Sequence, residues 1–313
     1  MKVSSASLIG FVIVVIGVLM SSAHAGDPST PFDRFTNIGS IVNTRHNMTQ
    51  SSAPLIVSVM NGARNNYGEV CVYCHTPHGA NNTIAAPLWN RTIKVTNYQT
   101  YDELGTTSLT QAVTSTPGSA SLTCLSCHDG QTAIDSIINM PGSGMGLLSQ
   151  QTTQNTAFLN SWPPGGGGPT QHMGLNSTNN VLGDGTGNRG CLVCHSTTGI
   201  LADFGPDFAI FNLGTDLRND HPIGITFPAP PGSPLPDWKT PLGVKGGSNY
   251  FDDNNNGRME KAEIRTYDGK VECASCHDPH GVPSAGTGTV FNKTFLRKQN
   301  TNGSAVCLSC HTK

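Results

Sequence analysis

The sequence predicts an elongated chain that is mostly coil, with short helices and few strands. Only 36% of its 313 residues are hydrophobic and 6% are aromatic, so apolar side chains are too few to build an ordinary core for this length. Glycine (36) and proline (20) together exceed one residue in six, which disfavours long regular elements. Something other than side chains must therefore supply the core.

The low charge of the chain excludes several classes of function. Charged residues make up 12% of the sequence and the formal net charge is -2. This composition is not that of a charged coiled coil, and it offers no basic face for nucleic acid. It also gives no reason to expect an anionic membrane surface as a partner.

The first 25 residues have the pattern of a removable signal peptide. Lys2 precedes an apolar run from Leu8 to Met20, and Ala23-His24-Ala25 forms a small-residue cleavage site. The alternative is a membrane anchor, but this run is shorter than the about 20 apolar residues that span a bilayer. We therefore expect an exported protein whose mature domain, residues 26–313, contains no membrane span.

All ten cysteines fall into five Cys-x-x-Cys-His motifs, numbered here in chain order. The first cysteines are 53, 67, 82 and 34 residues apart, so the motifs do not form a regular repeat. We expect a short helical turn at each motif. The motifs are Cys71-Val-Tyr-Cys74-His75 (motif 1), Cys124-Leu-Ser-Cys127-His128 (motif 2), Cys191-Leu-Val-Cys194-His195 (motif 3), Cys273-Ala-Ser-Cys276-His277 (motif 4) and Cys307-Leu-Ser-Cys310-His311 (motif 5).

The motif fits the covalent attachment of c-type haem. Its two thiols reach the two vinyl groups on one porphyrin edge and form thioethers, and the adjacent histidine then lies under the iron as proximal ligand. Zinc knuckles would need Cys-x-x-Cys units in twos, which leaves one of five alone. Thioredoxin-type pairs would need a βαβ context that the sequence lacks. The sequence thus predicts five haem c groups, a pentahaem cytochrome c domain and a core built from haem.

The histidine count predicts a second histidine ligand for every iron. Eleven histidines are present, of which one lies in the signal peptide and five belong to the motifs. Iron held by two histidines has no open position and transfers electrons instead of activating a substrate. Methionine sulfur could replace a histidine, but its simpler role is packing against porphyrin. The five predicted distal ligands are His46, His78, His172, His221 and His280.

Two of these distal candidates occupy near-duplicate strings. His78 follows motif 1 in His-Thr-Pro-His-Gly, and His280 follows motif 4 in His-Asp-Pro-His-Gly. A side chain three residues past a proximal histidine cannot reach the opposite face of the same iron, but it can reach a neighbouring haem. We therefore expect these histidines to bring haems into close contact. His221 precedes Pro222, which favours an extended backbone that presents one ring.

These strings resemble outer-surface multihaem cytochromes of metal-reducing bacteria, in particular the extracellular cytochrome filament (nanowire) family of outer-membrane cytochrome E. The resemblance implies stacked bis-histidine haems and protomers joined head to tail into conducting filaments. Its implied partners are copies of the chain itself, redox partner cytochromes and extracellular electron acceptors. It also implies that His46 ligates a haem of the next protomer. The similarity rests on Asn43-Thr-Arg-His46-Asn-Met, Cys71-Val-Tyr-Cys-His-Thr-Pro-His78-Gly, His221-Pro-Ile-Gly and Cys273-Ala-Ser-Cys-His-Asp-Pro-His280-Gly.

Residues 252–263 match the calcium-loop template D-x-N-x-N-G-x5-E. Gly246 and Gly247 precede the loop in place of an entering helix. The alternative is an Asn-rich turn closed by its own side chains. A Ca²⁺ ion would fix the segment before motif 4. Its predicted ligands are the side chains of Asp252, Asn254, Asn256 and Glu263 and the carbonyl of Arg258.

Electron transfer is the predicted function, with an extracellular filament as its sharper form. A soluble periplasmic or outer-surface electron shuttle uses the same chemistry and is the main alternative. A multihaem reductase would need one iron with an open position, and His172 is the first candidate for a histidine that leaves it open. The full set of histidines favours a protein that is not an enzyme.

Overall fold

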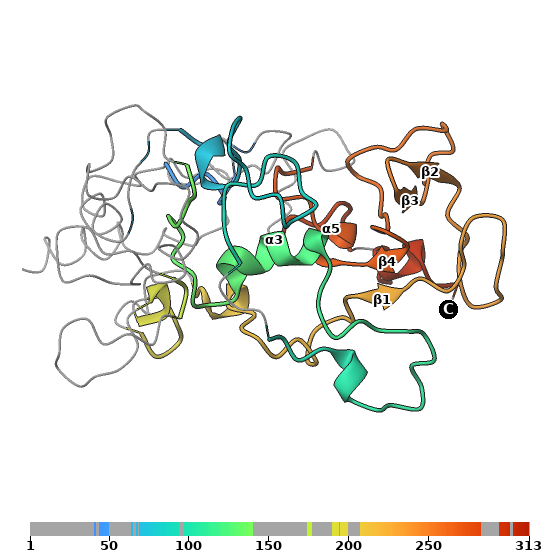
Figure 1. Cartoon of the computed structure of the whole chain (residues 1–313). Helices are drawn as coiled ribbons and strands as arrows, with labels where there is room; N and C mark the ends of the chain where they lie inside the picture. The colour runs from blue at the N-terminus through green and yellow to red at the C-terminus, as the bar shows by residue number, and fades with distance from the viewer. Residues whose placement is uncertain are drawn as a thin grey trace, which may run out of the picture.

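The computed structural model describes residues 41, 44–49, 64, 67, 69–93, 97–139, 174–176, 190–193, 195–199, 207–282, 294–300 and 303–312. The predicted signal peptide (1–25), His172 and Cys194 lie outside these residues. Within them the chain is mostly coil with short helices and small sheets, as the composition predicts (Figure 1). No helix in this described part is long and apolar enough to cross a membrane.

Each of the five motifs lies on a helical turn, as expected. In motifs 1, 3, 4 and 5 the histidine N–H donates to the carbonyl of the first cysteine at 2.8–3.1 Å. This bond spans one turn and fixes the first cysteine and the histidine relative to each other. Two further turns, η3 (Tyr101–Glu103) and η6 (Ala209–Phe211), lie between motifs. The motif turns are η2 (Cys71–Tyr73), α3 (Ser119–His128), η5 (Cys191–Val193), α5 (Cys273–Cys276) and η7 (Cys307–Ser309).

The described strands form two small antiparallel sheets. Strand β1 (Ile225–Thr226) pairs with β4 (Lys270–Val271), placing Ile225 opposite Val271. Strands β2 (Gly243–Lys245) and β3 (Ser248–Tyr250) form a hairpin just before the predicted calcium loop. Gly246 and Gly247 turn this hairpin with φ of 57° and 79°. Positive φ at both positions is what a two-residue hairpin turn of type I′ requires.

Small apolar clusters take the place of one large core in the described residues. Partly buried cysteines pack against them: Cys74 against the first cluster, Cys273 against the second, and Cys276 and Cys310 against the third. Large apolar groups attached at these cysteines would join the clusters into a continuous interior. These three clusters are Tyr67, Val72, Tyr73 and Ile137; Tyr98, Leu125, Leu217 and Ile223; and Phe227, Ala229, Phe251 and Ile264; Ala133 and Ile138 form a smaller fourth one.

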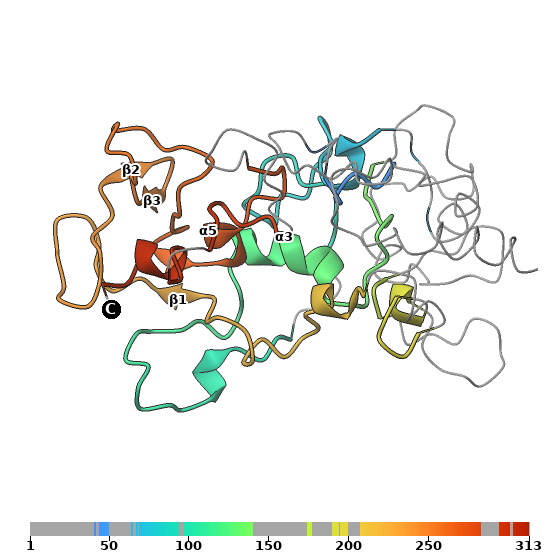
Figure 2. The same cartoon turned by 180° about the vertical axis from the view of Figure 1, so that it is seen from behind.

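Helices α3 and α5 contact each other near the middle of the described chain. Figures 1 and 2 show them side by side from both directions, with the C-terminal turn beyond α5 and the blue turn of motif 1 on the other side of α3. The contact brings motif 2 against motif 4, although their first cysteines are 149 positions apart in the chain.

Candidate haem-binding sites

Six motif and predicted distal histidines use Nδ1 to bind an oxygen and leave Nε2 as the ring nitrogen for a metal. A hydrogen bond from Nδ1–H fixes the tautomer with its lone pair on Nε2, as metal-ligating histidines require. The proximal histidines donate to carbonyls: His75 to Pro87 at 2.7 Å, His128 to Phe211 at 2.6 Å and His277 to Thr294 at 2.6 Å. The distal candidates bind Pro279 O (His46, 3.1 Å), Pro222 O (His221, 3.0 Å) and Asp278 Oδ1 (His280, 3.1 Å).

His75 of motif 1 lies opposite His280, the distal candidate that follows motif 4. Their ring centres are 6.1 Å apart and the rings are nearly parallel, at 11°. A metal–imidazole bond is about 2.0 Å long and a ring centre lies about 1.2 Å from its nitrogens, so two histidines on opposite sides of one metal have centres about 6.4 Å apart. The separation therefore fits an iron between the two rings. As expected, His280 reaches a different motif from the one it follows.

His128 of motif 2 lies opposite His46 of the same chain. The ring centres are 6.2 Å apart, again the separation that suits one metal between them, and the rings are nearly perpendicular at 77°. His46 also stacks on Phe295 with ring centres 4.3 Å apart. Burial, together with the charge of His128, lowers the pKa of His46 to about 4, so the ring is neutral and able to ligate at pH 7.

His46 lies against residues of its own chain. Its ring faces His128, and the interprotomer role that the family resemblance implies for His46 stays a prediction. Nδ1 of His46 is held by Pro279 of the same chain as well. Because both contacts are intrachain, motif 2 has a distal candidate without a second protomer.

The remaining distal candidates are less fully defined. Burial and the nearby charge of His221 lower the pKa of His311 in motif 5, which makes these two histidines neighbours. His311 also packs on Trp238, with ring centres 4.3 Å apart. His78 is exposed, and no aromatic or histidine ring in the described part of the chain lies against it. His172 lies outside the described residues. Because His280, His46 and His221 lie near motifs 1, 2 and 5, His78 and His172 are the distal candidates left for motifs 3 and 4.

Motifs 1 and 4 are held by the same backbone clamp. In each case a segment downstream, residues 87–91 for motif 1 and 294–298 for motif 4, runs antiparallel to the end of the motif. The first clamp bonds are Thr76 N–H to Leu88 O (2.8 Å) and Asn90 N–H to Cys74 O (2.8 Å). Their counterparts are Asp278 N–H to Phe295 O (2.9 Å) and Arg297 N–H to Cys276 O (2.8 Å).

The backbone conformation of the clamps is also shared. Leu88 and Phe295 occupy equivalent positions and have φ of 53° and 59°. Large side chains rarely adopt this left-handed conformation, so its occurrence at both places marks a common structure. In each clamp, the carbonyl that receives the Nδ1–H of the proximal histidine comes from the residue immediately before this one.

The last residue of each clamp is basic and reaches the next motif. Arg91 donates to the hydroxyl and carbonyl of Ser126 in motif 2, at 3.2 and 2.8 Å. Lys298 donates to the hydroxyl of Ser309 in motif 5 at 2.6 Å. Both serines directly precede the second cysteine of their motifs. Motifs 1 and 2 and motifs 4 and 5 therefore form two structurally equivalent units, called here the first and second paired units.

Glu272 and Ser121 join the two paired units. The Glu272 carboxylate accepts the backbone N–H of Gly118 at the start of α3, at 3.2 Å, and the hydroxyl of Ser121. Ser121 Oγ in turn accepts the N–H of Cys273 at 2.9 Å. Contact with Cys273, and burial, hold the pKa of the Cys124 thiol well above its ordinary value. The first cysteines of motifs 2 and 4 thus meet at the junction.

The contacts order the motifs along the molecule. The charge of Cys127 adds to burial in raising the pKa of Cys74 to about 12, which makes motifs 1 and 2 neighbours. Cys276 and Cys310 pack on one apolar cluster, so motifs 4 and 5 are neighbours too. Because Cys124 of motif 2 also meets Cys273 of motif 4, the order of these four motifs in space is 1–2–4–5. Motif 3 attaches beside motif 2, where the N–H of Asn176 donates to the carbonyl of Gly130 at 2.7 Å.

The predicted calcium loop also comes together in space. Its base is closed by backbone bonds on both sides, Phe251 N–H to Ile264 O at 3.0 Å and Thr266 N–H to Asn249 O at 2.8 Å. The described residues contain no group of three or more His, Cys, Asp or Glu side chains placed to hold a metal ion. A cation in the loop would therefore also use amide and carbonyl oxygens.

The residues present fit haem c: each motif lies on a helical turn, Nδ1 of three proximal histidines is hydrogen-bonded, and two histidine pairs have the separation of axial ligands. The family model of the doubled CXXCH motif matches residues 267–313, which contain the whole second paired unit. This region is therefore a haem-binding region of the c-type cytochrome kind, and its chemistry is haem c binding and electron transfer. No curated protein matches the chain.

Proposed function

We propose that this chain is an exported pentahaem cytochrome, residues 26–313, that carries electrons at or beyond the cell surface. One observation carries the proposal: the motifs contact one another in series, and the junction of Cys124 with Cys273 makes the two paired units continuous. When bound, each haem supplies a one-electron carrier. The chain's own residues set the spacing of these carriers, because the thioether positions of motifs 2 and 4 are in contact.

Paired histidines support electron transfer over catalysis. His280 opposite His75 and His46 opposite His128 would leave no open position on either iron. We expect the same of His221 with His311, and of His78 and His172 with the two remaining motifs. The chain would then lack a site where a small substrate could meet iron.

The ferric spectrum of the purified protein tests this proposal. Five bis-histidine irons give only low-spin signals in visible and paramagnetic resonance spectra, with five haems per chain by mass. A high-spin ferric signal in the unmodified protein would instead favour a multihaem reductase. In that case His172 is the first residue to examine, because it would be the histidine that leaves an iron open.

Export is proposed from the pattern of residues 1–25. If it is correct, the mature protein begins near Gly26, and the mass of the secreted form establishes this directly. A protein that keeps Lys2 and fractionates with membranes would instead identify the apolar run as an anchor.

Assembly into a filament is the sharper form of the proposal. It is supported by the resemblance to cytochrome filaments and by the exposure of His78, which has no ring against it among the described residues. We propose His78, in place of His46, as the histidine that ligates a haem of the adjoining protomer. Negative-stain microscopy of material sheared from cells tests the idea, with His78→Ala expected to abolish filaments and His46→Ala to keep them. Monodisperse particles from the unmodified protein would favour the soluble shuttle.

A further inference from the structure

The loop of residues 252–263 is acidic, with a formal charge of -2. Four of its twelve residues are acidic and two are basic. One acid, Asp253, is paired outside the loop with Lys298. The other three, Asp252, Glu260 and Glu263, stay within the loop.

The first and last residues of the loop place their carboxylates together. Asp252 is 9% exposed and accepts the backbone N–H groups of Asn256 at 3.0 Å and Gly257 at 2.6 Å. Gly257 has φ of 71°, so the chain turns sharply at the sixth position, where the calcium-loop template has its glycine. Asp252 and Glu263 are close enough for each carboxyl group to shift the pKa of the other.

The burial and hydrogen bonding of the Glu263 side chain indicate that this loop binds a cation. Its side chain is only 2% exposed, and its Oε1 has no hydrogen-bond partner, while Oε2 accepts the N–H of Glu260 at 2.8 Å. The nearest guanidinium, that of Arg265, donates to backbone carbonyls of the loop and not to this carboxylate. A buried carboxylate oxygen beside another carboxylate is costly unless a cation or proton neutralises it.

The remaining template positions supply neutral oxygens. Asn254 Oδ1 accepts the N–H of Asn256 at 3.2 Å, and Asn256 Oδ1 accepts the N–H of Arg258 at 2.8 Å. An amide oxygen has two lone pairs, so these bonds leave capacity for a cation. Both asparagine amide groups donate to the carboxylate of Glu260, at 2.8 and 3.0 Å, which fixes their orientation.

We propose that residues 252–263 bind one Ca²⁺ ion through side-chain oxygens of Asp252, Asn254, Asn256 and Glu263 and the carbonyl of Arg258. All of these ligands are oxygen, which suits a hard cation, and a twelve-residue loop with a terminal glutamate favours calcium over the smaller magnesium. The β2–β3 hairpin replaces the entering helix of an EF-hand, and the backbone bonds at the base of the loop hold its two ends together.

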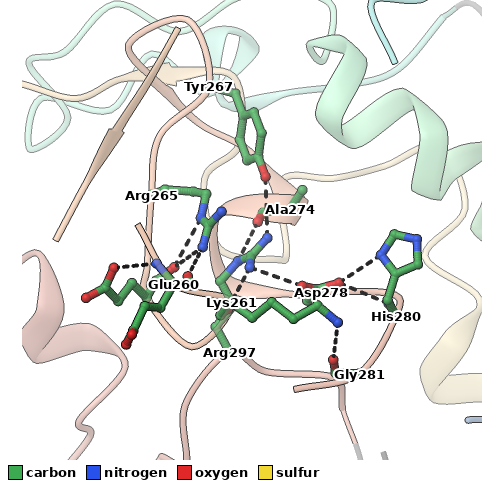
Figure 3. Close-up of polar contacts among 10 residues, drawn as sticks. Glu260, Lys261, Arg265, Tyr267, Ala274, Asp278, His280, Gly281 and Arg297 are labelled. Carbon is green, nitrogen blue, oxygen red and sulfur yellow. Dashed lines mark hydrogen bonds and ion pairs between the residues drawn. The ribbon is translucent and has the colours of Figure 1, made fainter. Parts of the chain in front are cut away.

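The bound ion would also steady the turn that presents His280. Lys261, in the loop, donates its Nζ to the carbonyl of Gly281 at 3.0 Å, and its own carbonyl accepts from Arg297 at 2.7 Å. Arg297 forms an ion pair with Asp278 at 3.3 Å, and Asp278 holds Nδ1 of His280. Figure 3 shows these contacts running from the loop to the His280 ring. Ordering the loop therefore orders the backbone that places His280 opposite His75.

Calorimetry of the full haem-loaded protein, first stripped with a chelator, tests the proposal. Titration with Ca²⁺ is expected to show one saturable site with a Kd of about 10⁻⁷ to 10⁻³ M, the range of sensor and extracellular calcium loops, and Mg²⁺ is expected to bind at least about tenfold more weakly. Ca²⁺ should also slow tryptic cleavage after the exposed Arg258. Absence of saturable Ca²⁺ binding to the unmodified protein overturns the proposal and leaves a shared proton between Asp252 and Glu263 as the explanation.

Two matched variants separate the site from general charge. Glu263→Gln keeps the shape of the side chain and should weaken Ca²⁺ binding by at least about tenfold, since it removes the bidentate ligand. Asp253→Asn removes the same charge from the same loop, but this carboxylate faces Lys298, so its Kd should change by less than about threefold. Equal losses in the two variants would contradict the assigned ligands. If Glu263→Gln does not fold, Ca²⁺ titration of the unmodified protein alone tests the proposal.

Discussion

The Nδ1 atom of His46 lies 3.1 Å from the carbonyl oxygen of Pro279, although 233 positions separate the two residues. Pro279 stands in a four-residue turn between His277, the proximal histidine of motif 4, and His280, which faces motif 1. The same turn orients His46, which faces motif 2. Residues 277–280 therefore serve three motifs at once, and a disturbance of this turn should reach all three.

Replacing His46 by alanine should open one iron within a single chain. All five haems should stay attached, because the thioether cysteines are untouched, and about one iron in five should become high-spin. Paramagnetic resonance with intact-protein mass spectrometry measures both quantities. Arg45→Ala, whose guanidinium lies over Phe211, is the neighbouring control and should stay low-spin. If the His46→Ala protein keeps all its irons low-spin but no longer assembles into filaments, His46 ligates a haem of the next protomer instead.

Replacing Asp278 by asparagine should weaken the fold by about 3 kcal/mol, because it leaves the buried guanidinium of Arg297 without the carboxylate that neutralises its charge. The two side chains are 8% and 4% exposed. Although burial alone would raise the pKa of Asp278, hydrogen bonds from His280 and the charge of Arg297 hold it at about 2. The carboxylate is thus ionised at neutral pH. Chemical unfolding measures the loss; the exposed Asp216→Asn should lose much less, and equal losses would rule out this ion pair as the cause.

Replacing Arg91 by methionine should cost about 3 kcal/mol of unfolding free energy, since it strands several buried carbonyls. Its fully buried guanidinium also donates to Ile134 O at 2.8 Å and Ala133 O at 2.7 Å. Lys298→Met, the equivalent change in the second paired unit, should cost about 1 kcal/mol because that side chain is less buried and makes fewer bonds. Thermal or urea unfolding compares them. The reverse order of losses would argue against equivalent roles for the two residues.

The stability of the protein should fall as the pH drops from about 6.5 to about 4. Burial and the charge of His128 lower the pKa of His46 from 6.5 to about 4, so in this window the unfolded chain binds a proton that the folded chain does not. The expected loss from this residue between pH 6.5 and pH 4 is roughly 3 kcal/mol, and ligation of iron by the same ring would extend the loss below pH 4. Comparing the unfolding free energy of wild type and His46→Gln across this pH range isolates the contribution of His46. Identical pH profiles would mean that other groups dominate the loss of stability.

The sequence was enough to predict the elements that local chemistry determines. A Cys-x-x-Cys-His string needs a single turn, and five turns are present. The reach of His280 away from its own motif also followed from a spacing of three residues. The partner of His46 could not be predicted in the same way, because it depends on how coil segments more than two hundred positions apart pack together.

The two paired units were missed for a different physical reason. Their clamps, residues 87–91 and 294–298, bind through backbone groups, so Pro-Leu-Trp-Asn-Arg and Thr-Phe-Leu-Arg-Lys can form the same structure without matching side chains. The unequal spacing of 53 and 34 residues between their motifs hides the duplication further. A readable signal was the basic residue that ends each clamp, together with the Leu-Ser-Cys-His ending of motifs 2 and 5.

An experimental structure of the haem-loaded protein tests the central claim most directly. The account predicts that the iron attached at Cys71 and Cys74 is bound by His75 and His280. It also predicts that the iron attached at Cys124 and Cys127 is bound by His128 and His46 of the same chain. Density that shows either iron bound by a different histidine, by methionine or by a residue of another protomer would contradict the account.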